Sequence, residues 1–314
     1  MIKEYAPVLI ITLNRFEKLK LCVESLRDNH LAKQTDLFIA LDYPSKPEHF
    51  PGYEKIVDFL EGLNGFNSIN IIKRSENFGI VKNYLTAKNE LFEKYDAVIF
   101  SEDDNEFSTD FLNFMNKCLR QYKDDRTIFS ISGYNYPVIM PSNYNLQVYK
   151  WVGHSAWGFG IWKDRWENIS WDEQKIASVT KKFLKQYSRV YDYIRIANHY
   201  FSSALTIAID RKINGDGFIN LYQFENNYHS IFPVESRVKN HGHDGTGRSE
   251  ANIVDSPYLQ QSLYSGDSNY EIPLIVPEDK QINKILKKHF QVPLINLIRS
   301  SIKLVMFNLG IIFK

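Results

Sequence analysis

The 314-residue chain has only two cysteines, Cys22 and Cys118, and both fall on the apolar faces of predicted helices. Because so few cysteines cannot build a disulfide scaffold, we interpret them as reduced packing residues of a cytosolic protein. Residues 1–7 lack a basic region followed by an apolar one, so no signal peptide is predicted. No uninterrupted apolar run reaches the length of a membrane span.

An excess of charge is also lacking, since 38 Lys and Arg side chains face 37 Asp and Glu side chains. A dedicated nucleic-acid binder would carry a basic excess, so that class is disfavoured. The glycine-rich fingerprints of dinucleotide folds and P-loops are missing, which makes a dehydrogenase or a kinase a poor interpretation. There is no internal repeat and no low-complexity tract.

Short apolar runs instead alternate with helical periodicity through the first half of the chain. The runs at residues 8–12, 37–41, 69–72 and 97–100 have the length and β-branched content of buried strands. Helical patterns separate them, the first one capped by Asn14, so βαβ units and a parallel sheet are predicted. A fifth strand is predicted at residues 129–132, and a helix is predicted across residues 175–212.

Three adjacent carboxylates, Glu102, Asp103 and Asp104, follow the strand at residues 97–100 directly. Open α/β sheets bind ligands at the carboxyl ends of their strands, and a divalent cation would relieve the repulsion among three acids. Oxygen ligands favour Mg²⁺ or Mn²⁺. The alternative is a solvated acidic loop before a helix, which the preceding strand and the helical pattern after Asp110 disfavour.

Polar side chains also follow the other predicted strands. Asn14 and Arg15 come after the first strand, and Asp42 comes after the second. Acids and amides suit a base and a ribose, while arginine suits phosphates. Each of these residues alone is more often a cap or turn residue, but their recurrence predicts a nucleotide site along one edge of the sheet.

The segment Ser101-Glu-Asp-Asp104 followed by Phe107-Ser-Thr-Asp-Phe111-Leu112 resembles the metal-binding motif of GT-A glycosyltransferases. The family typified by N-acetylglucosaminyltransferase I, with related bacterial sugar transferases, is the most similar. The resemblance implies a Rossmann-like mixed sheet with flanking helices. It also implies that Asp104 holds the Mn²⁺ or Mg²⁺ of a nucleotide-sugar diphosphate, that Asp103 lies beside the ribose, and that Glu102 completes the motif.

The same resemblance assigns further donor contacts. It implies that Arg15 lies near the diphosphate, that Asp42 reads the uracil edge, and that Lys82 or Asn83 approaches the base. In the aromatic segment 151–166 we expect Trp157, between the small residues Ala156 and Gly158, to form a platform for the sugar. Trp162 and Trp166 are expected to be core residues.

Two later segments complete the expected site. Asp216, between two glycines, is more often a turn residue, but it occupies the position of the family's catalytic base ahead of a Ser-Arg stretch; Asp210 and Asp172 are the alternatives. The segment Ser-Arg237-Val-x-Asn-x-Gly-x-Asp-Gly245-Thr-Gly resembles the loop that closes over the nucleotide sugar. Its histidines, His241 and His243, are interpreted as loop residues rather than metal ligands.

The composition changes at residue 280, after which no acid occurs. We expect a nucleotide-sugar-binding half at residues 1–145, an acceptor-binding and catalytic half at 146–279, and a basic amphipathic helical tail at 280–314, broken at Pro293. The tail is either a membrane-surface element or a segment that packs on the domain or on a second subunit, and the one-sided charge favours the membrane. Its basic residues are Lys280, Lys284, Lys287, Lys288, Arg299, Lys303 and Lys314.

The resemblance therefore implies a metal-dependent, inverting glycosyltransferase that uses a nucleotide sugar, UDP-linked, and a glycan or lipid-linked glycan acceptor in surface polysaccharide synthesis. We expect it at the cytoplasmic face of the membrane, with no nucleic-acid partner. Two alternatives stay open: a sugar-phosphate nucleotidyltransferase, and a non-catalytic carbohydrate-binding or scaffold protein on the same fold. The first would need a glycine-rich loop after the first strand, and residues 12–16 contain no glycine.

Overall fold

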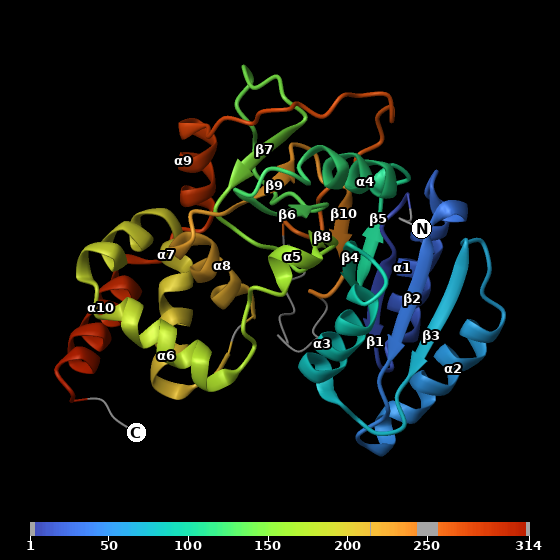
Figure 1. Cartoon of the computed structure of the whole chain (residues 1–314), viewed down its shortest axis with the longest axis horizontal. Helices are drawn as coiled ribbons and strands as arrows, with labels where there is room; N and C mark the ends of the chain where they lie inside the picture. Colours follow the sequence, from blue (N-terminus) through green and yellow to red (C-terminus); the bar gives the residue numbers. More distant parts are fainter. Residues whose placement is uncertain (1–3, 214, 244–256, 312–314) are drawn as a thin grey trace.

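The computed structural model describes residues 4–213, 215–243 and 257–311. A mixed eight-stranded sheet in the order β3-β2-β1-β4-β8-β6-β9-β7 forms its centre (Figure 1). The sheet is built from β1 (Val8–Thr12), β2 (Asp36–Leu41), β3 (Ser68–Lys73), β4 (Ala97–Glu102), β6 (Ile128–Ser132), β7 (Val148–Trp151), β8 (Phe159–Trp162) and β9 (His229–Pro233). All five predicted strands are therefore confirmed.

The direction of the strands divides the sheet into two parts. Strands β1 to β4 are parallel, as predicted, whereas β8 runs antiparallel between β4 and β6. Beyond β8, β6 pairs with β9 in parallel and β7 closes the edge in antiparallel orientation. Strands β7 and β8 thus run opposite to the other six strands, which makes the sheet mixed.

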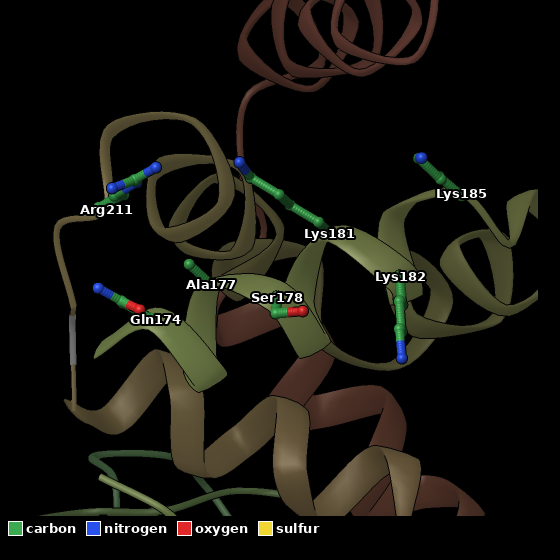
Figure 2. Close-up of a pocket in the computed structure, with 7 residues that line it drawn as sticks. All are labelled: Gln174, Ala177, Ser178, Lys181, Lys182, Lys185 and Arg211. Carbon is green, nitrogen blue, oxygen red and sulfur yellow. The ribbon is translucent and has the colours of Figure 1, made fainter. Parts of the chain in front are cut away.

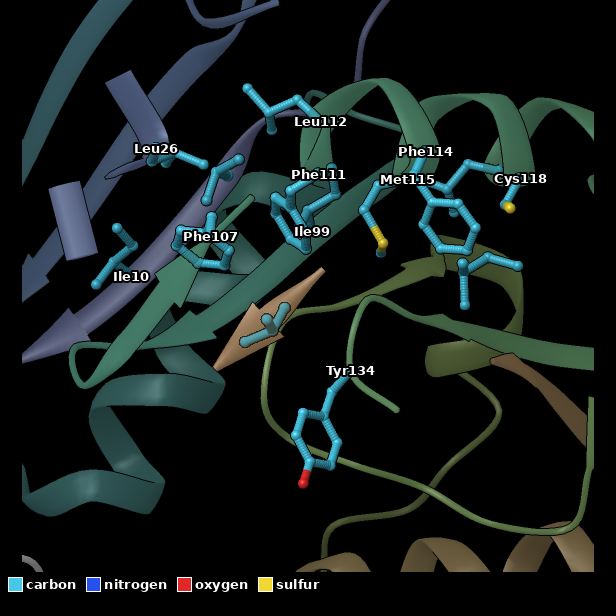
Figure 3. Close-up of a cluster of buried hydrophobic side chains, with 14 of the residues drawn as sticks. Ile10, Leu26, Ile99, Phe107, Phe111, Leu112, Phe114, Met115, Cys118 and Tyr134 are labelled. Atoms are coloured by element: carbon cyan, nitrogen blue, oxygen red, sulfur yellow. The ribbon is translucent and has the colours of Figure 1, made fainter. Parts of the chain in front are cut away.

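Two helical layers cover the sheet because successive strand side chains point to opposite faces. Val8 and Ile10 face a cluster shared with helices α1 (Phe16–Arg27), α2 (Phe50–Glu61) and α4 (Phe111–Gln121). Leu9 faces the other cluster, with α3 (Gly79–Phe92) and α5 (Lys163–Trp166). Figure 3 shows how Phe111, Phe114 and Met115 of α4 pack toward Ile99 of β4. Two short 3₁₀ turns, Ala32–Gln34 and Pro47–His49, lie in the loops.

A helical layer built from the second half of the chain extends the second face of the sheet. Helices α6 (Glu173–Leu184), α7 (Tyr187–Asp210) and α8 (Gly215–Glu225) share a buried cluster with α10 (Leu294–Asn308). The single helix predicted for residues 175–212 is wrong, because the chain ends one helix at Leu184 and α7 is itself kinked at Ala197. Asp216, whose flanking glycines are more typical of a turn, lies in the first turn of α8.

The predicted tail consists of two helices, α9 (Lys280–His289) and α10, separated at Pro293 as expected. Asp279 caps α9. Two apolar residues of this helix, Ile282 and Leu286, are 1 % and 0 % exposed. Phe290 stacks on Trp151 of β7, with 5.6 Å between ring centroids. So α9 packs on the domain, which is one of the two alternatives predicted for the tail.

Neither Asn14 nor Asp110 caps a helix with its side chain. The cap position of α1 is Arg15 rather than Asn14, and no side chain caps that helix. Asp110 occupies the cap position of α4, but its carboxylate accepts hydrogen bonds from Tyr270 and Asn113 instead of from the helix backbone. The structure also contains a small sheet that the sequence pattern does not predict, in which β5 (Asn105–Phe107) pairs antiparallel with β10 (Val238–Asn240).

Candidate active site

The candidate site lies at the edge of the sheet where the parallel strands end. Ile11 of β1 pairs with Glu102 of β4, and Thr12 pairs with Leu41 of β2, so the three carboxyl ends are level. Arg15, Asp42 and the acidic motif follow directly after these ends. The polar residues predicted after successive strands are therefore brought to one edge.

Asp103 and Asp104 form the centre of the site and are only 3 % and 6 % exposed. The Thr12 hydroxyl donates to Asp103 Oδ2 over 2.7 Å. Arg15 bridges both carboxylates: it pairs with Asp103, and its Nη1 lies 2.8 Å from Asp104 Oδ2. Burial raises the pKa of Asp103, while the Arg15 charge opposes that rise. The guanidinium shows that this site favours a cation.

The small β5–β10 sheet brings the late glycine-containing segment against the acidic motif. Asn240 donates to Asp104 Oδ1 over 2.7 Å, and the His241 backbone N–H donates to the Asp104 carbonyl over 2.8 Å. A Cβ atom on Gly242 would lie 2.5 Å from Asp104 Oδ2, so a larger residue here would have to displace that carboxylate. Sequence reasoning missed Asn240 as a site residue, although it belongs to the segment that carried the resemblance.

The donor set fits a divalent cation of the Mg²⁺ or Mn²⁺ type. Within the described parts of the chain, no group of three His, Cys, Asp or Glu side chains is arranged to hold a metal ion. Nucleotide-dependent sites typically need only one or two carboxylates, because phosphate oxygens and waters complete the octahedron. Asp104 and Asp103 supply such carboxylates, and Asn240 fixes one oxygen of Asp104.

Asp216 stands at the start of α8, and its side chain is 46 % exposed. Asn220, one turn further along α8, fixes the helix: its side chain donates to the Val152 carbonyl over 3.2 Å and accepts from Tyr193 over 2.8 Å. Although the side chain is about half-exposed, the surrounding protein reduces its hydration and raises the pKa of Asp216 to about 6. A carboxylate in this range can accept a proton near neutral pH.

Glu102 links Asp216 to the acidic motif. Burial raises the pKa of Glu102 to about 8, with further contributions from the charges of Asp104, Asp216 and Asp103. Tyr84 of α3 likewise has its pKa raised first by burial and then by Asp216 and Glu102. Asp216, although far away in sequence, is therefore close enough for its charge to act on both Glu102 and Tyr84.

His154 is a site residue that sequence reasoning missed. Its Nε2 atom lies 4.0 Å from Asp216 Oδ1, and its side chain is only 2 % exposed. Burial lowers the pKa of His154 to about 3, so the ring is neutral at physiological pH. Tyr136 and Tyr200 donate to the His154 carbonyl over 3.1 and 3.4 Å and hold the residue in place. The glycine and aromatic residues of its segment were the only sequence signal.

On the other flank of the site, Asp42 organises the start of α3. Its carboxylate accepts hydrogen bonds from the backbone N–H groups of Phe78 (2.8 Å) and Gly79 (2.9 Å). Asn83 is 2 % exposed, and its amide donates to the Ala40 carbonyl over 3.1 Å. Lys82 is exposed and lies 3.8 Å above the Phe78 ring. Of these predicted base contacts, Asp42 and Asn83 are engaged within the protein, and Lys82 faces solvent.

The three remaining residues predicted to contact the donor are Trp157, Arg237 and Gly245. Trp157 is half-buried in edge contact with Tyr134, with ring centroids 4.8 Å apart, and beside His243 and Tyr258. Arg237, predicted to contact the donor, is 0 % exposed, and its side chain packs against the Phe114 and Tyr264 rings. Gly245 lies outside the described residues.

The reserve carboxylates and the loop histidines have structural contacts instead. Asp172 caps α6 by accepting from the Lys175 N–H over 2.8 Å, and Asp210 is the exposed last residue of α7. The His241 ring contacts Glu106 instead, with Nε2 2.7 Å from Glu106 Oε2. These contacts leave Asp216 as the one predicted base candidate next to the acidic motif.

The comparison with protein families identifies the same part of the chain as the geometry does. Residues 1–138 match the sequence model of the GNT-I family. The match contains β1 to β4, β5 and α4, and therefore the whole acidic motif. It confirms the predicted resemblance over these residues and the GT-A type of fold, a mixed sheet with flanking helices followed by C-terminal helices. No curated protein shows a significant match to the chain.

The chain is also distantly similar to solved structures. TarS from S. aureus, solved with UDP-GlcNAc, is 16 % identical over 41 % of this chain and 33 % of its own, with a TM-score of 0.30. The mannosyltransferase PcManGT from Pyrobaculum calidifontis, in complex with GDP-Man and Mn²⁺, is 10 % identical over 71 % of this chain and 69 % of its own, with a TM-score of 0.36. The chain thus spans about a third or less of two of the TarS structures it matches.

Proposed function

We propose that this protein is a metal-dependent, inverting glycosyltransferase that transfers a sugar from a UDP-linked donor to a glycan or lipid-linked glycan acceptor. The observation that carries the proposal is the meeting of three distant segments at one strand edge. Asp104 of the acidic motif lies against Asn240 of the late segment, and Asp216 of α8 acts electrostatically on Glu102. The GNT-I match over the first of these segments supports sugar transfer as the reaction.

In this proposal the acidic edge binds the donor. Asp104, with Asp103 beside it, would hold the divalent cation, which neutralises the charge of the donor diphosphate. Arg15 would release these carboxylates and turn its guanidinium to the phosphate oxygens, a partner it matches in charge and geometry. Asp42 would keep the start of α3 in place beside the base. Trp157 would form the apolar wall against which the sugar lies.

Asp216 would act as the general base. Its carboxylate accepts the proton of the acceptor hydroxyl while the hydroxyl oxygen forms a bond to the anomeric carbon. The bond from that carbon to the diphosphate oxygen breaks, and the nucleotide diphosphate leaves with the bonding electron pair. His154, neutral and 4.0 Å away, adds no positive charge, so it leaves the Asp216 carboxylate basic.

The two alternative functions have less support. A nucleotidyltransferase needs a glycine-rich loop for a triphosphate after the first strand, whereas residues 12–16 have no glycine and Arg15 is directed to Asp103 and Asp104. A non-catalytic scaffold would need no carboxylate with a raised pKa at the site, and both Glu102 and Asp216 have one.

We further propose that the enzyme builds surface polysaccharide and works at the cytoplasmic face of a membrane. A lipid-linked acceptor is confined to such a surface, so an enzyme held there meets it at high effective concentration. The acid-free sequence after residue 279 supports this location through its attraction to anionic lipid.

The proposal is tested by incubating the protein with a panel of UDP-, GDP- and dTDP-sugars and measuring release of the free nucleotide, with and without Mn²⁺. Slow donor hydrolysis reports the donor without a known acceptor. We expect release from one UDP-sugar, dependent on the metal, and none from nucleoside triphosphates. Release of pyrophosphate from a triphosphate and a sugar phosphate would instead identify a nucleotidyltransferase.

A further inference from the structure

An apolar stripe remains exposed along α10 although the opposite face of the helix is packed. Leu304 is 6 % exposed and packs into the cluster of α6, α7 and α8, with Leu297 and Phe307 beside it. The exposed side chains recur every three or four residues and so form one face of the helix. They are Leu294, Ile298, Ile302, Val305 and Leu309, which are between 45 % and 72 % exposed, with Ile295 alongside.

The charges beside this stripe are all positive. Arg299 and Lys303 are exposed on α10, and neither α9 nor α10 contains an acid. At its end, α10 contacts α6, the helix that carries a basic pocket: the Asn308 side chain donates to the Leu184 carbonyl over 3.0 Å. Figure 2 shows that pocket, which has a volume of about 500 Å³. Its basic lining residues are Lys181, Lys182, Lys185 and Arg211.

We propose that the stripe on α10 and the basic pocket of α6 form one surface that docks the enzyme on an anionic lipid bilayer. An apolar face with basic residues on its flanks is the pattern of a helix that lies in the membrane interface. A second copy of the chain is a poorer occupant, because paired α10 helices would bring Arg299 and Lys303 together without any acid from either α10. This deepens the proposed function, since it rests on a membrane-linked acceptor.

The geometry favours a helix that lies on the membrane over one that spans it. Among the described residues, no single helix is long and apolar enough to cross a bilayer, and α9 and α10 meet that criterion only together, with a 90° bend between them. The apolar residues of α9 are already covered, since Ile282 and Leu286 are buried in the domain. The docking surface is therefore α10 and not the whole segment after residue 279.

The test compares sedimentation of the full chain with vesicles of neutral phosphatidylcholine alone and with 30 % phosphatidylglycerol. The double variant Ile298→Glu with Ile302→Glu changes only exposed side chains and keeps the packed face of α10. Its matched control, Ile139→Glu with Ile275→Glu, changes two residues that are 90 % and 82 % exposed elsewhere. A second variant, Lys181→Gln with Lys185→Gln, reduces the charge of the pocket alone.

We expect the wild type and the Ile139 and Ile275 control to bind the anionic vesicles equally and neutral vesicles at least tenfold more weakly. The α10 variant should lose at least tenfold in vesicle affinity, and the pocket variant several-fold, with binding of the latter less sensitive to salt. Equal binding by the wild type and the α10 variant overturns the proposal. The proposal is also overturned if the wild type does not bind vesicles and light scattering shows it to be a dimer, whereas the α10 variant is a monomer. Metal-dependent UDP binding, measured in solution for each variant, tests the proposed function separately.

Discussion

Asp216 is the residue on which the proposed chemistry depends most. We predict that Asp216→Asn binds UDP and metal normally but loses at least about 10²-fold in kcat, the effect of removing a general base. Asp210→Asn is the matched control, because Asp210 is an exposed carboxylate at the end of the neighbouring α7, and it should retain its activity. Steady-state kinetics with the identified donor measure both variants. Near-normal turnover by Asp216→Asn would assign the base to another group.

The raised pKa of Asp216 predicts how the rate depends on pH. Only the ionised carboxylate accepts a proton, so kcat/KM should rise about tenfold per pH unit below a pKa of about 6 and level off above it. The sign follows because protonation at low pH removes the base. Residual activity of Asp216→Asn should lack this rise. If the wild type and Asp216→Asn showed the same rise of kcat/KM with pH, a group other than Asp216 would control it.

Among the elements, the β5–β10 pair brings the segment at residues 240–242 against Asp104, the proposed metal ligand. We predict that Gly242→Ala weakens Mn²⁺-dependent UDP binding at least about tenfold, because the added methyl group would lie 2.5 Å from Asp104 Oδ2. Gly62→Ala is the control: its Cβ would have no neighbour within 4 Å. Calorimetric titration with UDP and Mn²⁺ reads out both. An unchanged affinity of Gly242→Ala for UDP with Mn²⁺ would mean that the segment around Gly242 does not contribute to the proposed metal site.

The elements also show where sequence patterns fail. Strands β1 to β4 and β6 were predictable because each is a short apolar run, and α4 was predictable because its apolar residues recur with helical periodicity. Helix α8 was not, because Gly215, Asp216 and Gly217 favour a turn locally, whereas packing of Phe218 and Leu221 and the Asn220 hydrogen bonds stabilise a helix. Tertiary contacts outweighed local propensity at this point.

The candidate site was predictable only where its residues are close together in the sequence. Glu102, Asp103 and Asp104 are neighbours in sequence, so a strand followed by acids reveals them. The contact of Asn240 with Asp104 and that of His154 with Asp216 join residues far apart in the chain. No local pattern encodes such a pairing. Burial is equally hidden from local patterns: Arg237, a basic residue in a glycine-containing segment, is 0 % exposed.

At the level of the whole molecule, α9 makes the end of the described chain part of the domain. We predict that Leu286→Ala lowers the free energy of unfolding by about 2–5 kcal/mol, the cost of a cavity at a side chain that is 0 % exposed. Leu294→Ala on exposed α10 should change it by less than about 0.5 kcal/mol. Urea unfolding of both variants measures the difference. Equal stability would indicate that α9 is detached from the domain in solution.

The central claim concerns the whole strand edge: it binds a nucleotide diphosphate through a divalent cation held by Asp104. The most direct measurement is the shift in melting temperature caused by UDP, with Mn²⁺ and with excess chelator, for the wild type and Asp104→Asn. The account predicts that UDP stabilises the wild type only when Mn²⁺ is present, and that Asp104→Asn stays folded but shows no metal-dependent shift. An equal shift by UDP in chelator, or an undiminished shift in Asp104→Asn, would contradict it.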